Sequence, residues 1–88
     1  MSRFVTTGVN GNEIAFGFDR PLGEYFVQEF DPANELIIDL NSSGQSMVKN
    51  HEPMSNSAMY EAIVQRLTDR DKSRFKPQLS ALLLDLPF

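Results

Sequence analysis

The sequence predicts an α+β domain of two layers, in which a four-stranded antiparallel β-meander is followed by two C-terminal helices (ββββαα). Three observations predict this fold. Short runs rich in β-branched and aromatic residues alternate with turn residues over positions 1–40. A polar stretch rich in serine and asparagine follows over 41–56, and apolar residues then recur at helical spacing over 57–86.

The first two strands are expected over 3–9 and 13–18, on either side of Asn10-Gly11. Asn-Gly between extended runs is a strong hairpin signal, because both central residues of the tightest turns take positive φ. We therefore expect a two-residue turn. The pairs that this register predicts are Val5 with Phe16 and Phe4 with Gly17.

Two further strands are expected over 24–30 and 35–40. The turn over 19–23 contains proline, which fixes φ, and ends in glycine. The turn over 31–34 begins Asp-Pro, which is typical of a type I turn.

Alternation along the strands predicts which side chains face the helices. The expected core residues of the sheet are Ile14, Phe16, Phe18, Phe26, Phe30, Leu36, Ile38 and Leu40. The opposite face is expected to carry Phe4, Ala15, Tyr25, Val27 and Ile37. That face is more apolar than a solvent-exposed face of a sheet needs to be. Either a helix covers it, or a second copy or another protein binds there.

The rest of the chain is expected to form a long loop and two helices. The loop spans 41–56, and loops of such length are usually functional or mobile. Ser55 and Ser57 can cap a helix over 57–68, whose apolar stripe is Met59, Tyr60, Ile63, Val64 and Leu67. Residues 69–76 form a polar connector or continue that helix. Pro77 suits the first turn of a helix over 77–86, with Leu79, Leu82, Leu83 and Leu86 on one side.

Length and composition are those of a single small globular domain over 1–88. The chain has no cysteine, which excludes disulfides, thiolate metal sites and cysteine nucleophiles. No apolar run reaches the roughly 18 residues that a membrane helix needs. No signal-like segment begins the sequence, so we expect a cytoplasmic protein.

Charge is distributed unevenly along the chain, whose net charge is −4. Residues 1–64 hold nine acidic and three basic residues, whereas 66–76 hold five basic and two acidic ones. The basic cluster includes Arg70, Lys72 and Arg74. An acidic body repels a polyanion, so direct nucleic-acid binding is not expected, and the basic segment suits an acidic partner or a solvated turn.

No pattern of catalytic or metal-binding residues emerges. The stretch over 39–44 resembles the opening of a calcium loop, but Asn50 stands where such loops place a bidentate glutamate. His51 is the only imidazole, and no nucleophile elbow surrounds the nearby serines. We therefore expect no cofactor, no metal and no enzymatic activity.

The sequence thus favours a non-catalytic, acidic protein-interaction module. It would regulate or inhibit a larger basic or nucleic-acid-handling partner, or self-associate as a homodimer through its sheet. The candidate interaction residues are Phe4, Arg20, Tyr25, Val27, Ile37, Arg70, Lys72 and Arg74. The alternative is a small-ligand-binding or enzyme domain with a site near 41–56, which a homodimer could complete at its junction. In that site His51, Glu52 and Asp39 would converge.

Overall fold

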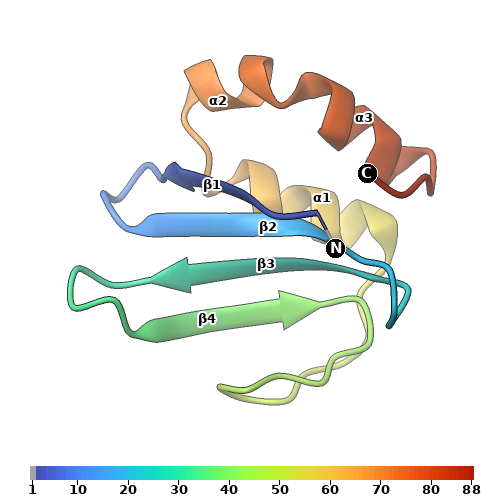
Figure 1. The fold of residues 1–88 in the computed structure, drawn as a ribbon, viewed down its shortest axis with the longest axis horizontal. Helices are drawn as coiled ribbons and strands as arrows, with labels where there is room; N and C mark the ends of the chain where they lie inside the picture. The colour runs from blue at the N-terminus through green and yellow to red at the C-terminus, as the bar shows by residue number, and fades with distance from the viewer. Residues whose placement is uncertain (1) are drawn as a thin grey trace.

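The computed structural model describes residues 2–88 and has the α+β architecture that the sequence predicts. The four strands are β1 (Phe4–Thr7), β2 (Glu13–Asp19), β3 (Glu24–Phe30) and β4 (Leu36–Asn41). They form one antiparallel sheet in chain order, so β1 and β4 are its two edges (Figure 1). The meander is therefore confirmed.

Three helices follow the sheet, where the sequence predicts two: α1 (Asn56–Val64), α2 (Asp69–Arg74) and α3 (Lys76–Leu83). Ser55 caps α1, its Oγ accepting from the Ala58 N–H at 3.1 Å. Thr68 caps α2 in the same way, accepting from the Asp71 N–H at 3.2 Å. The expected helix over 57–68 ends early, and the second cap starts a separate helix within 69–76, where a polar connector or a continuation of the first helix was expected.

The C-terminal helix is shorter than expected. Pro77 lies in its first turn, but α3 ends at Leu83, and Asp85 then takes a left-handed conformation with φ 57°. Leu79 and Leu82 are buried, whereas Leu83 and Leu86 are half exposed, so only half of the expected leucine stripe packs inward. None of the helices within residues 2–88 has the length and apolar character needed to span a membrane.

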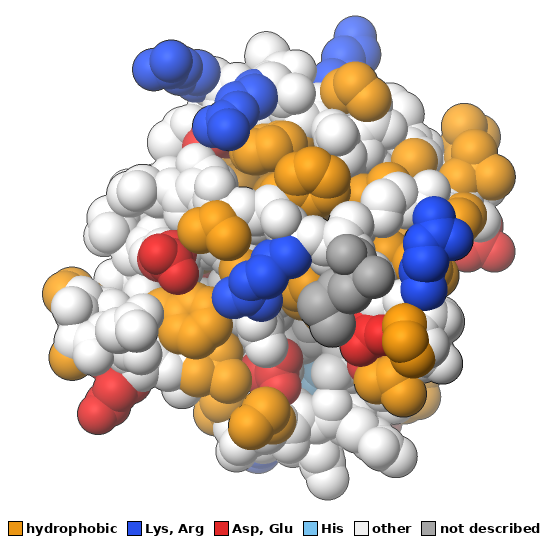
Figure 2. Space-filling view, viewed as in Figure 1, with side chains coloured by type: hydrophobic (Ala, Val, Ile, Leu, Met, Phe, Trp, Pro, Cys, Tyr) orange, Lys and Arg blue, Asp and Glu red, His pale blue; other side chains and the backbone are white. Residues whose placement is uncertain are grey.

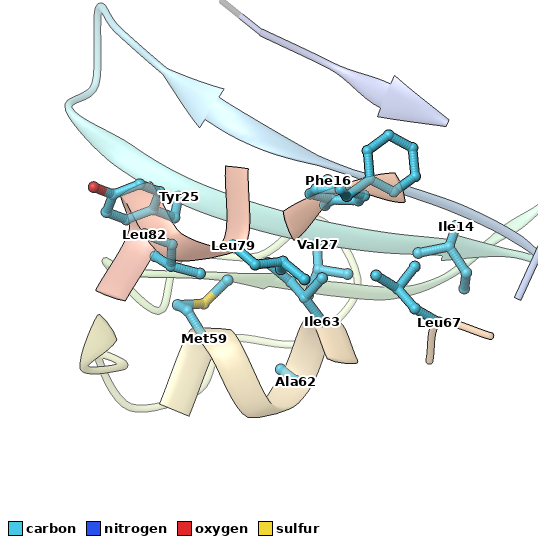
Figure 3. Close-up of a cluster of buried hydrophobic side chains, with 11 residues drawn as sticks. Ile14, Phe16, Tyr25, Val27, Met59, Ala62, Ile63, Leu67, Leu79 and Leu82 are labelled. Atoms are coloured by element: carbon cyan, nitrogen blue, oxygen red, sulfur yellow. The ribbon is translucent and has the colours of Figure 1, made fainter. Parts of the chain in front are cut away.

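The hydrophobic core lies between the sheet and the helices (Figure 3). α1 covers one face of the sheet, while α2 and α3 lie on the β1 side of the molecule (Figure 1). The ring of Phe16 packs edge-on against that of Phe75 at 5.1 Å, which joins β2 to the α2–α3 junction. The buried cluster comprises Ile14, Phe16, Tyr25, Val27, Met59, Ala62, Ile63, Leu67, Phe75, Leu79 and Leu82.

The register predicted for the first hairpin is wrong by one residue. Phe4 pairs with Phe16, not with Gly17. The Gly8 N–H donates to the Asn12 carbonyl at 2.8 Å, and the Gly11 N–H to the Gly8 carbonyl at 3.0 Å. Within this loop, only Gly11 takes the left-handed conformation, with φ 85°. The loop therefore has three residues, and the extra residue turns every side chain of β1 to the other face.

The faces predicted for β3 are also wrong. Tyr25 pairs with Phe18 and Val27 with Phe16, so both point into the core, where they are 4% and 0% exposed. Phe26 and Phe30 alternate with them and occupy the opposite face. The turn fixes this result, because Asp19 pairs directly with Glu24 and sets odd residues of β3 against even residues of β2.

Candidate functional site

The outer face of the sheet, which the sequence suggests as an interface, is largely filled by its own side chains. Phe4, Tyr25 and Val27 are not on it, since all three pack in or against the core. The Arg3 guanidinium lies 5.8 Å from the ring centre of Phe30 and covers part of this face. Figure 2 shows the face opposite α1, where hydrophobic, basic and acidic side chains are intermixed. It offers no continuous apolar patch.

The β4 edge of the sheet is more distinctive. The Ser42 N–H donates to the Tyr25 carbonyl at 3.1 Å, so it points toward β3, whereas the Asn41 N–H points away, 3.4 Å from Nε2 of His51. Alternate residues of an edge strand direct their backbone groups outward. Asp39 therefore directs its N–H and C=O away from β3, and neither group has a partner among residues 2–88, although the residue as a whole is only 7% exposed beside the following loop.

The loop after β4 folds back beside this edge and is held there by side chains of β4. The Asn41 Oδ1 accepts from the Gly44 N–H at 2.8 Å, and the Asp39 Oδ2 accepts from the Met47 N–H at 2.9 Å. The His51 N–H donates to the Gly44 carbonyl at 2.8 Å. The polar residues of 41–56 thus form a folded loop through their own hydrogen bonds, and Asx side chains are well suited to this.

A groove of about 370 Å³ lies between the β4 edge and this loop. We call it the edge groove. Its apolar wall comes mainly from β4, and its polar wall comes from the loop. Val48 is 49% exposed and Ile37 is 39% exposed, so both present apolar surface there. The residues that line it are Ile37, Ile38, Asp39, Leu40, Ser46, Val48, Lys49, Asn50 and His51.

His51 and Asp39 meet in the edge groove, but both side chains are engaged with the protein itself. His51 Nε2 faces the Asn41 N–H and must accept from it, so Nδ1 carries the proton and donates to the Glu52 carbonyl at 2.8 Å. Asp39 accepts from the Met47 N–H and, at 3.3 Å, from the Gln28 amide. Glu52 is exposed and does not line the groove. The expected convergence therefore brings His51 and Asp39 together, but each is already bonded to the protein itself.

The segment that resembles a calcium loop is likewise occupied by its own contacts. The oxygens of Asp39 and Asn41 accept backbone N–H groups, which a cation would have to displace. Within the described residues 2–88, no three His, Asp or Glu side chains are grouped so as to hold a metal ion. The oxygens that the resemblance to a calcium loop rests on are thus bonded to the backbone of the loop itself.

The basic candidates lie away from the edge groove. Arg20 is exposed in the turn between β2 and β3, while the other three are on α2, across the sheet from β4 (Figure 1). Lys72 pairs with Asp69 at 3.5 Å. Arg74 lies 3.8 Å from Asp71 and 4.7 Å from the ring centre of Phe75. Of the eight candidate residues, only Ile37 lines the groove.

Sequence reasoning missed Val48 and Lys49 as parts of this groove, although its alternative hypothesis named His51 and Asp39 as residues that would converge near the loop. The available signal was the apolar pair Met47 and Val48 in an otherwise polar loop, since apolar side chains there need either burial or a partner. Comparison with known proteins adds no further guide: the chain matches no family model, no curated protein and no solved structure.

Proposed function

We propose that this chain is a non-catalytic protein-interaction module that binds an extended segment of a partner protein along β4. The observation that carries the proposal is the outward-directed backbone of Asp39, which has no hydrogen-bond partner among residues 2–88 and lines the edge groove. An extended peptide adds a strand to a free sheet edge, in which main-chain hydrogen bonds supply affinity and pockets for alternate side chains supply specificity. The β4 edge offers both components.

The groove also defines the chemistry of the segment. Ile37 and Val48 favour apolar side chains at alternate positions of the bound strand. Lys49 lines the groove and forms no ion pair among residues 2–88, so it favours a carboxylate on the bound strand. The partner segment is therefore an extended, apolar peptide with an acidic residue.

A peptide fits this edge better than a second copy of the chain does. The loop over 46–51 stands beside β4, and pairing two β4 strands would bring two such loops into the space beside the shared edge. Docking through an acidic surface has less support. The acidic side chains on the face shown in Figure 2 lie apart from one another and form no patch there.

Selection from a phage-displayed library of random peptides tests the proposal, with two variants at one position as the controls. Asp39→Pro removes the outward N–H, and Asp39→Ala removes the same carboxylate but keeps that N–H. Proline is tolerated on an edge strand where the N–H faces solvent. We expect enriched peptides with alternating apolar residues that bind Asp39→Ala more weakly than wild type, because the loop loses its bond to the Asp39 carboxylate, and that do not bind Asp39→Pro. Equal binding to both variants, or no enrichment, would overturn the proposal.

A further inference from the structure

A second groove lies among the three helices, on the side of the molecule away from β4 (Figure 1). We call it the helical groove, and its volume is about 530 Å³. Its residues come from α1, α2 and α3 and are Tyr60, Glu61, Val64, Lys72, Ser73, Lys76, Leu79, Ser80 and Leu83. The proposal for the β4 edge uses none of them.

Part of the lining of the helical groove is apolar, and this part comes from α1 and α3. Leu79 is buried at its base, and Tyr60 and Val64 are partly buried along α1. Leu83 is 50% exposed at the end of α3, and the chain continues from it into Leu84, which is 70% exposed. Half-exposed leucines beside a groove leave apolar surface in contact with water, which a partner would cover.

The charge beside the groove is mainly positive. Lys72 and Lys76 both line it, and Glu61 is the one acidic residue among its lining residues. Lys76 has no ion pair within residues 2–88, and Lys72 pairs only with the exposed Asp69. Both lysines come from α2 and the start of α3, so the groove has a basic end near these residues and an apolar end at Leu83.

The kind of segment that fits here differs from the one that fits β4. Helices satisfy their backbone groups internally, so the helical groove offers side chains and has no strand edge to extend. A groove between helices accepts a further helix, which inserts its apolar side chains between theirs. The two lysines then require carboxylates on that helix.

We infer that the helical groove binds an amphipathic helix of a partner protein, with its apolar face on Leu79 and Leu83 and its acidic residues on Lys72 and Lys76. The module then has two docking surfaces, one for a strand and one for a helix, on separate parts of the fold (Figure 1). It can hold two segments at once. The two sites share no lining residue, so the proposal for one site can be wrong while the proposal for the other holds.

The test uses a synthetic helical peptide with leucines on one face and glutamates along its border, and a second peptide with lysines in place of the glutamates. Binding is followed by titrating the isotope-labelled full chain and recording amide shifts of Tyr60 and Leu83. The test variant is Lys72→Glu with Lys76→Glu. The control is Arg20→Glu with Arg70→Glu, which changes the net charge equally at two exposed residues that line neither groove.

We expect the glutamate peptide to bind wild type and the control alike, and the test variant about tenfold more weakly, as the loss of two surface charge pairs implies. The lysine peptide should prefer the test variant. Equal binding of the glutamate peptide to the test variant and the control, or no shift at Tyr60 and Leu83, would overturn the inference. Binding at β4 is unaffected by either result.

Discussion

The Nε of Arg66 lies 3.2 Å from Oε1 of Glu29, in an ion pair that joins β3 to the chain just after α1. Glu29 is almost fully buried, and its other oxygen accepts from the amides of Asn10 and Asn12, each at 2.8 Å. The Arg66 carbonyl accepts from the Val9 N–H at 3.0 Å. One carboxylate thus holds the first hairpin loop, the sheet and the helical layer together.

This network predicts a pH dependence of stability. Burial alone raises the pKa of Glu29, but the two amide hydrogen bonds and the guanidinium of Arg66 outweigh burial, so the pKa lies below its ordinary value. A depressed carboxyl pKa stabilises the fold above the unfolded-state value of about 4.3, and this stability is lost as pH falls through the folded-state value.

We therefore expect Glu29→Gln to lower the free energy of unfolding by about 2 kcal/mol at neutral pH, because hydrogen bonds to a charged acceptor are lost. The difference from wild type should shrink on acidification. Urea denaturation of both proteins, at pH values from neutral to below about 4, measures this difference in the free energy of unfolding. A difference that stays constant over this range would contradict the role given to the Glu29 charge.

The corrected strand faces are tested by one substitution at two positions. Val27 is 0% exposed in the core, and Val5 is 45% exposed on the outer face. Val27→Ala should cost about 2 kcal/mol, because it leaves a cavity, whereas Val5→Ala should change stability by less than about 0.5 kcal/mol. Thermal or urea unfolding of the two variants measures these costs. Similar losses of stability at the two positions would contradict the strand register described above.

The strands and their faces show what the sequence could and could not predict about the fold. The positions and order of the strands followed from residue types, and the helices follow the sheet as expected, although three form where two were predicted. The face of the sheet on which each side chain lies did not follow from residue types. It depends on loop length, because one additional loop residue turns every side chain of a strand to the other face. Asn10-Gly11 fits both a two-residue turn and the three-residue loop that forms, and only packing of Phe4 against Phe16 distinguishes them.

Two glycines with positive φ allow the folding of the long loop to be measured. Gly44 has φ 84° and Gly23 has φ 64°. A Cβ on Gly44 would overlap the His51 carbonyl oxygen, whereas a Cβ on Gly23 would meet nothing within 4 Å. Gly23→Ala should therefore cost only the left-handed conformation, about 1–2 kcal/mol.

Gly44→Ala should cost more than Gly23→Ala, and it should also speed amide hydrogen exchange of His51, whose N–H is bonded to the Gly44 carbonyl. Because His51 lines the edge groove, binding of peptides selected on wild type should weaken in Gly44→Ala. If both variants bound such peptides as wild type does, the loop would not form a wall of the site.

The C-terminal residues are held to the sheet by Tyr25. Its hydroxyl donates to the Leu86 carbonyl at 2.8 Å, and its ring stacks on that of Phe88 at 5.7 Å. Tyr25→Phe should cost about 1 kcal/mol. Burial, with the nearby charge of Asp85, raises the pKa of Tyr25.

A raised phenol pKa stabilises the fold fully below the unfolded-state value of about 10, and this stability is lost as pH rises through the folded-state value. Wild type should therefore lose more stability than Tyr25→Phe above this pH. Urea midpoints measured on either side of it give the comparison, and parallel losses in the two proteins would contradict the buried contact.

The candidate site was less predictable than the fold. The sequence singled out 41–56 as a functional or mobile loop, and the edge groove does lie along it. It could not show that Asp39 and Asn41 hold the loop against β4, since these contacts depend on the strand register. Of the residues singled out as candidates, Ile37 and Lys72 line grooves, because exposed apolar and basic side chains can be recognised individually while their neighbours cannot.

The most direct test of the central proposal is amide hydrogen exchange at Asp39, measured with and without a peptide selected on the full chain. The account predicts fast exchange in the free protein, because this N–H has no partner among residues 2–88, and marked slowing in the complex as the bound strand accepts from it. Unchanged exchange at Asp39 in a saturated complex would show that the peptide binds elsewhere and would contradict strand addition at β4.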